Sequence, residues 1–213
     1  MGNSAQGLPV AAGPEEVPWP VYIPCVLGDR LWQGEVLQNV IQLKPSLDSI
    51  QVPDGEIEVI SVQHEYAVVM SQDCDLVKDY DRRKSGGAEV LPNVLLCDLY
   101  QAEVLRIKIN EEDNLGSRDW KRLIAPNRNE RFQYLQRIAA SEDLQSEGLP
   151  ALAIDFRLYF TIPTDELYYR LNKEIRRRAR LNSPYIEHLA QRFFKFQGRV
   201  ALPNDHAVDA IMG

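Results

Sequence analysis

The sequence predicts an α+β fold, with a small β-barrel in the first part of the chain and alternating strands and helices in the last part. Short apolar runs separated by turn residues occupy the region 22–109, which is typical of a small barrel or a strongly coiled sheet. After Leu152 the chain first alternates apolar and polar residues and then shows two helical patterns. The length of 213 residues fits one domain, or a core with an appendage.

We divide the chain into four segments. Prolines among small and acidic residues predict a disordered or extended arm at 1–21, whose end Trp19 and Tyr22 hold against the body. The other segments are a barrel core at 22–125 with a long loop at 73–90, a C-terminal α+β element packed on the barrel at 126–203, and a flexible tail at 204–213.

Composition narrows the class of protein. The net charge of -7 and the pI near 5.1 argue against a protein coated in nucleic acid, although a local basic patch could still bind it. The longest apolar runs are far shorter than the ~20 residues of a membrane-spanning helix, and the first residues do not form a charged-then-apolar secretory leader. We therefore expect a cytoplasmic protein with no membrane partner.

Cysteines and histidines give no metal-binding pattern. Cys25, Cys74 and Cys97 are odd in number and widely spaced, which indicates reduced thiols in a cytosol. The sequence contains no Cys-x-x-Cys pair, and its three histidines are scattered, which argues against structural zinc. Glycine-rich phosphate-binding loops are also absent from the sequence. We expect no metal and no other cofactor.

The predicted strands of the barrel core follow from apolar runs. They lie at 36–43, 57–62, 66–70 and 94–97, with His64 near a turn between the second and the third. The run 66–70 reads as a strand buried on both faces. Residues 104–109 alternate as a half-exposed strand or as the end of a helix.

The residue pattern of the C-terminal element predicts a strand, a helix, a second strand and a second helix, in that order. Residues 131–135 fit either a helix face or a strand, whereas 152–162 alternate as one strand with one buried face. Pro163 ends that strand, and Thr164 can cap a short helix to Leu171. A final helix begins with Ser183 as N-cap and Pro184 at its first position, and Gly198 ends it.

Residues 175–181 allow two interpretations. A returning strand would place Arg176, Arg178 and Arg180 on one face, while a continued helix would spread the arginines around it. Together with Arg82, Arg83 and Lys84 these side chains are the candidate binding residues. In a chain of charge -7 we favour an acidic protein partner over nucleic acid as their ligand.

A polar cluster follows the buried strand and is the sharpest candidate site. It contains Ser71, Asp73, Cys74 and Asp75, which would be the catalytic residues if the protein were an enzyme, with His64 as a base. A cysteine nucleophile needs positive neighbours, and two adjacent carboxylates act in the opposite sense. We therefore expect Cys74 to pack as a small hydrophobic residue.

The same reasoning applies to the carboxylates of the cluster. We expect Asp73 and Asp75 to cap turns or to pair with the basic residues 82–84. With Asp98 they could collect Mg²⁺, but aspartates at turns are more often structural.

Two stretches, taken with the turn at Gly28 and Asp29, resemble a group of prokaryotic proteins. The signature of that group is an apolar strand followed by Ser/Thr-Gln-x-Cys-Asp-Leu, which residues 71–76 match. Residues 183–189 through 199–203 resemble the C-terminal element of the same group. The order of a Gly-Asp strand, a loop, a Val-Val strand and a short apolar strand also resembles the barrel of MazF/PemK toxins.

This resemblance implies an SH3-like, MazF/PemK-type barrel and, at its strongest, an endoribonuclease. MazF/PemK toxins carry Arg-Pro ahead of the Val-Val strand, and the arginine takes part in cleavage; this chain has Glu65 and Tyr66 there. An acidic side chain at that place would repel RNA phosphate. The resemblance therefore predicts a non-enzymatic protein-binding or regulatory component of a bacterial stress, toxin–antitoxin or phage-defence (antiviral) module. The alternatives are a divergent MazF/PemK-like endoribonuclease and, more remotely, a cysteine-dependent hydrolase using Cys74.

Overall fold

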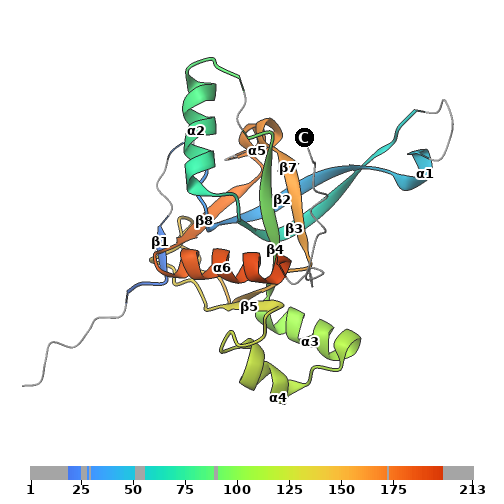
Figure 1. Ribbon diagram of the computed structural model, residues 1–213, viewed down its shortest axis with the longest axis vertical. Helices are drawn as coiled ribbons and strands as arrows, with labels where there is room; N and C mark the ends of the chain where they lie inside the picture. The colour runs from blue at the N-terminus through green and yellow to red at the C-terminus, as the bar shows by residue number, and fades with distance from the viewer. Residues whose placement is uncertain are drawn as a thin grey trace, which may run out of the picture.

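The computed structural model describes residues 19–24, 28, 30–50, 56–88, 91–171 and 173–198 (Figure 1). Over these residues the protein is a mixed α+β structure, which confirms the predicted class. Residues 1–18 of the predicted arm at 1–21 and the predicted tail at 204–213 lie outside the described residues. At the end of the arm, Tyr22 is buried and its hydroxyl donates to the carbonyl of Gln136 over 2.9 Å, so Tyr22 holds this segment to the body as expected. The side chain of Trp19, which was expected to act with it, is instead 71% exposed.

One antiparallel sheet organises the described chain. Its strands are β1 (Tyr22–Pro24), β2 (Glu35–Pro45), β3 (Val59–Val69), β4 (Asn93–Gln101), β5 (Phe132–Leu135), β6 (Leu152–Asp155), β7 (Tyr159–Pro163) and β8 (Arg176–Leu181). Their order is β1-β8-β2-β3-β4-β6-β5, and β7 pairs with β4 beside this path. The sheet is open, not the closed barrel that the short strands predicted, because its two end strands, β1 and β5, do not pair with each other. β8 returns from the C-terminal part of the chain and adds to β2. The predicted segments 22–125 and 126–203 thus share one sheet.

The helices lie around this sheet (Figure 1). They are α1 (Leu47–Ile50), α2 (Asp73–Lys84), α3 (Ala102–Asp113), α4 (Ser117–Asp119), α5 (Thr164–Arg170), α6 (Tyr185–Gln197) and a π-helical turn η1 (Trp120–Ile124). In Figure 1, α6 crosses the strands, α3 and α4 group at one end, and the β2–β3 hairpin projects away with α1 at its tip. None of the described helices combines the length and the apolar character that a membrane crossing requires.

Two apolar layers cover the centre of the sheet. Val68 on β3 packs in one layer with Ile186 and Phe193 of α6. Ala67, its neighbour on β3, points to the other layer, where Leu76 of α2 belongs. Because successive side chains of a strand point to opposite faces, this run is buried on both sides, as its apolar sequence predicts. A third cluster joins α3 and η1 to β5 and β6.

The predicted break at His64 is wrong. β3 runs without interruption through His64, which pairs with Val40 of β2. The imidazole stacks on the ring of Phe160 with centroids 3.8 Å apart, and its Nδ1 lies 3.3 Å from a carboxylate oxygen of Asp98. These tertiary contacts stabilise a polar residue inside a strand that the sequence pattern divides in two.

The predicted loop at 73–90 is also wrong, because its first twelve residues form α2. Acidic residues occupy the first turn of α2 and basic residues the last turn. Charges in these positions interact favourably with the helix dipole and stabilise the helix. Only Leu76 and Asp79 are buried on α2, so the sequence carries no apolar stripe that would reveal a helix. Asp79 accepts a hydrogen bond from the backbone of Leu91 over 2.9 Å and pairs with Arg83.

Two ambiguous segments are settled by packing. Residues 104–109 lie in α3, because Leu105 and Ile109 pack on the third cluster, so the helical alternative is correct. Residues 132–135 form β5, where Phe132 pairs with Asp155 of β6.

The single predicted strand at 152–162 is two strands. The chain turns after Asp155, whose carboxylate accepts the backbone N–H of Arg157 over 3.1 Å. β6 then pairs with β5 and the end of β4, while β7 pairs with the first half of β4.

The order β7-α5-β8-α6 matches the predicted strand, helix, strand and helix. The caps differ from the prediction. Thr164 does not cap α5, because its hydroxyl donates to the carbonyl of Leu91. Ser183 does not cap α6, which begins at Tyr185 and ends before Gly198.

Candidate functional site

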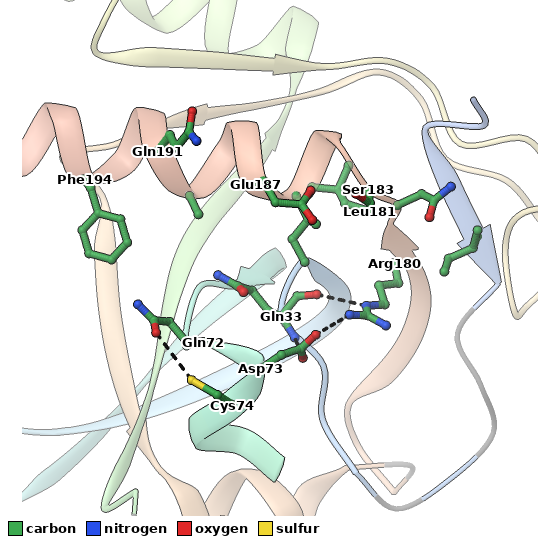
Figure 2. A pocket seen from close by; sticks show the side chains of 14 residues that line it. Gln33, Gln72, Asp73, Cys74, Arg180, Leu181, Ser183, Glu187, Gln191 and Phe194 are labelled. Carbon is green, nitrogen blue, oxygen red and sulfur yellow. Dashed lines mark hydrogen bonds and ion pairs between the residues drawn. The ribbon is translucent and has the colours of Figure 1, made fainter. Parts of the chain in front are cut away.

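A pocket of about 620 Å³ opens between the first turn of α2, the end of β8 and one side of α6 (Figure 2). Its floor is apolar and includes Leu181, Ile186 and Ala190. Phe194 lies at one end of the pocket and is 57% exposed, although it belongs to the apolar side of its helix. An exposed aromatic ring beside an apolar floor is typical of a binding surface.

The pocket brings together the two stretches that carry the resemblance described above. Gln72, Asp73 and Cys74 come from the first stretch, and Ser183 and Glu187 come from the second. These stretches lie more than a hundred residues apart in the sequence. β8 brings them together, because its end pairs with the start of β2 and the second stretch follows β8 directly. The sequence did not predict that both would line one pocket.

Asp73 is the charged centre of this site. One carboxylate oxygen accepts the backbone N–H of Gln33 over 2.9 Å and lies 3.3 Å from a guanidinium nitrogen of Arg30. The other oxygen accepts a hydrogen bond from Arg180 of β8 (Figure 2). Both guanidinium groups also stack on the ring of Trp32, 3.6 and 4.4 Å from its centroid. Asp73 therefore ties three segments together and has both oxygens occupied.

The predicted partners of Asp73 differ from the observed ones. The basic residues 82–84 lie in the last turn of α2, at the opposite end of the helix from Asp73. Sequence reasoning missed Arg30, Trp32 and Gln33 as site residues, since their short segment showed only a turn and a strand beginning. The available signal was the Arg-x-Trp spacing of Arg30 and Trp32, which allows the guanidinium to stack on the ring.

Cys74 is exposed, so the expected packing as a small hydrophobic residue is wrong. It is the second residue of α2, and the buried position in that turn belongs to Leu76. The Sγ atom lies 3.6 Å from Oε1 of Gln72 and 3.7 Å from a carboxylate oxygen of Asp75. Both neighbours are acceptors, so the thiol acts as a hydrogen-bond donor. Figure 2 shows its contact with Gln72. His64, the base proposed from the sequence, lies on β3, where it contacts Asp98 of β4 and Phe160 of β7, and it does not line this pocket.

Ser71 has a structural partner of its own. Its hydroxyl oxygen accepts the backbone N–H of Leu95 over 2.9 Å, which fixes the end of β3 against β4. Over the residues described, no group of three or more histidine, cysteine or carboxylate side chains is arranged to hold a metal ion.

The predicted arginine face of β8 is divided among three environments. The strand interpretation is correct, but Arg178 is only 1% exposed and donates to both carboxylate oxygens of Asp143 over 2.9 and 2.6 Å. Arg176 lies at the surface with Glu147, and Arg180 lies in the pocket with Asp73. Of the three candidate binding residues on β8, Arg178 is thus held inside the fold.

Some of the basic residues of α2 also contact other side chains of the fold. Arg83 pairs with Asp79 and with Asp165 of α5. The amine of Lys84 lies 5.9 Å from the centre of the Tyr80 ring. Arg82 and Lys84 are exposed.

Burial and hydrogen bonding act in opposite directions on Asp143. Burial alone would raise the pKa of its carboxyl group, but hydrogen bonds from Arg178 and from the backbone of Gln145 and Gly148 lower the pKa below its ordinary value. On α6, burial and the nearby charge of Arg192 lower the pKa of His188. His188 faces a different hollow, beside β5, and so does not contribute to the pocket at α2.

Comparison of the chain with protein families, with curated proteins and with solved structures gives no match.

Proposed function

We propose that this protein is a non-enzymatic binding protein that holds an extended segment of a protein partner in the pocket between α2 and α6. The observation that carries this proposal is the lining of the pocket: carboxamide side chains surround an apolar floor. The carboxamides are Gln33, Gln72, Asn182 and Gln191.

Carboxamides suit a peptide ligand for a simple chemical reason. Each one presents a donor and an acceptor, the same pair that a peptide group presents. An apolar side chain of the ligand would contact Ile186, Ala190 and Phe194, while its backbone would hydrogen-bond to the amides of the rim.

The charge of the pocket favours a peptide over a nucleic acid. Among its lining residues Arg180 is accompanied by two carboxylates, Asp73 and Glu187. Phosphate recognition depends on a surplus of positive charge, and Arg180 is already paired with Asp73. This supports binding over the alternative of a divergent endoribonuclease.

The surroundings of Cys74 favour binding over cysteine-dependent hydrolysis. A thiol nucleophile is activated by an adjacent base or positive charge. Here the hydrogen-bonding neighbours of Sγ are an amide oxygen and a carboxylate oxygen. The assignment to a bacterial stress, toxin–antitoxin or phage-defence module rests on the resemblance of residues 71–76 and 183–203 alone.

A displayed library of random unstructured peptides tests the proposal. The wild type should enrich peptides that share an apolar anchor, and Ala190→Arg should abolish their binding because its side chain fills the pocket. Gln197→Arg adds the same charge to the same helix outside the lining and should leave binding unchanged.

Two results would contradict the proposal. One is a set of enriched peptides that bind Ala190→Arg as well as the wild type. The other is cleavage of a mixed RNA pool by the wild type that is lost in Asp73→Asn with the fold intact, which would establish the endoribonuclease instead.

A further inference from the structure

One ionised side chain of the α2–α6 pocket has no partner among the described residues. The lining contains three groups that are ionised at neutral pH, namely Asp73, Arg180 and Glu187. Asp73 and Arg180 bind each other. Within the described part of the chain, neither a hydrogen-bond donor nor a cation contacts the carboxylate of Glu187, which is exposed in the first turn of α6.

The cation of the pocket is not available to Glu187. Arg180 donates to Asp73, and its Nε atom donates to the backbone carbonyl of Gln33 over 3.2 Å. Its guanidinium group also lies 4.4 Å from the centre of the Trp32 ring. Because these contacts hold Arg180 at its place beside α2, a cation that pairs with Glu187 has to come from the ligand.

The arginines of β8 are occupied in the same way and leave little for an acidic ligand to bind. Each one pairs with a carboxylate of the fold: Arg176 with Glu147, Arg178 with Asp143, and Arg180 with Asp73. Among the described residues, the charge that remains unpaired beside the apolar floor is that of Glu187. The pocket therefore complements a basic ligand, and not the acidic partner that a row of arginines suggests.

Glu187 lies on the same side of α6 as the apolar contacts of the pocket. Ala190 and Phe194 follow it after three and seven residues, spacings that return to one face of a helix. Figure 2 shows Glu187 and Phe194 extending from α6 toward the side of the pocket where Gln72 and Asp73 lie. At a rise of ~1.5 Å per residue, ~10 Å of helix separates Glu187 from Phe194. About three residues of an extended peptide cover that length.

We infer that Glu187 selects a lysine or an arginine of the bound peptide, about three residues away from the apolar side chain that contacts Phe194. This inference rests on the proposed function, because it names the chemistry of the peptide that the same pocket holds. The cation of the ligand pairs with the Glu187 carboxylate at the rim, where water screens the interaction. The pair therefore changes affinity modestly, by about threefold, and acts mainly on the choice between ligands.

Selection from a displayed library of random peptides tests the inference. The wild type should enrich peptides that combine an apolar anchor with a lysine or an arginine. Glu187→Gln should keep the anchor and lose the preference for a basic residue, whereas Glu187→Lys should select an aspartate or a glutamate there. Glu111→Lys makes the same charge change at an exposed position of α3 and should select the same peptides as the wild type.

A synthetic peptide then measures the pair directly. One enriched sequence is made with its basic residue and with glutamine in place of that residue, and fluorescence anisotropy gives each Kd. The replacement should weaken binding to the wild type about threefold and leave binding to Glu187→Gln unchanged, because that variant has already lost the contact. Added salt should raise the Kd of the basic peptide for the wild type more than for the variant. Circular dichroism checks that each variant is folded, and the near-isosteric Glu187→Gln decides if Glu187→Lys does not fold.

The possible failures can be told apart. Wild-type peptides that share an apolar anchor but no basic residue overturn the inference and leave the proposed function standing. A glutamine replacement that weakens binding to the wild type and to Glu187→Gln equally has the same meaning. If the wild type enriches no peptide, or if the enriched peptides bind Ala190→Arg equally well, the proposed function fails and the inference fails with it.

Discussion

Arg177 and Glu35 form an ion pair inside the sheet, where their side chains are 1% and 0% exposed. The same guanidinium donates to the carbonyl oxygen of Arg30 over 2.9 Å and to that of Gly28. Arg177 therefore fixes the position of the segment that contains Arg30, and Arg30 in turn contacts Asp73 in the pocket. The buried pair thus helps to hold the pocket in shape.

Replacing Arg177 with methionine should destabilise the protein strongly, because Glu35 would be left as an unpaired buried charge. Loss of one partner of a buried pair costs about 3–5 kcal/mol. The double variant Glu35→Leu/Arg177→Met removes both charges and should recover a large part of that loss. Urea unfolding of the single and double variants measures the difference. Equal destabilisation by the single and double variants would show that the pair itself is not the cause.

The Arg178–Asp143 pair should make stability depend on acid pH. The folded state lowers the pKa of Asp143, so this group stabilises the fold above its unfolded pKa, and the contribution is lost as the pH falls through the folded pKa. Asp143→Asn removes the titration. The difference in unfolding free energy between wild type and variant should therefore shrink as the pH falls below the ordinary aspartate range, as measured by urea unfolding at several pH values. A difference that is constant with pH would contradict the assignment.

Thiol alkylation should distinguish two cysteines of the native protein. Cys74 is exposed and should react with iodoacetamide within the native fold. Cys97 is buried, and burial together with the charge of Asp98 raises the pKa of its thiol, so it should react only after unfolding. Peptide mapping by mass spectrometry, with and without urea, measures both sites. Protection of Cys74 in the folded protein would place its side chain inside the core.

Gly34→Ala should destabilise the junction between the pocket and the core. Gly34 has a φ of +74°, and an added Cβ would lie 2.9 Å from the Cδ1 atom of Ile186 in the pocket floor. The strained backbone and the overpacking together should cost about 1–3 kcal/mol in urea unfolding.

Gly86→Ala is the matched control for that clash. Its φ is +75°, but nothing lies within 4 Å of the added Cβ, so only the backbone term remains. Equal losses from the two substitutions would show that contact with Ile186 does not matter.

The sequence by itself determined the class of fold and the elements with a strong pattern. Val68 and its neighbours form a strand buried on both faces, as an uninterrupted apolar run predicts. The alternation of β7 and the apolar side of α6 also appear where the pattern places them, because each element buries one face against the same sheet.

Tertiary structure decided the elements whose stability comes from polar contacts. The helix at 73–84 buries only Leu76 and one carboxylate, so periodicity could not reveal it. His64 remains in a strand because Phe160 and Asp98, both distant in sequence, contact its ring. The split after Asp155 depends on which strand each half can pair with, a choice that local sequence does not contain.

The candidate site divides in the same way. The sequence picked out Asp73, Cys74 and Arg180, because polar residues after an apolar strand and arginines in a row are visible in one dimension. It could not show that Asp73 binds Arg180 and Arg30, that Arg178 is buried on Asp143, or that α6 forms the opposite wall of the pocket. Those relationships arise when β8 inserts beside β2, since only the pairing of strands far apart in the chain brings these side chains within hydrogen-bonding distance.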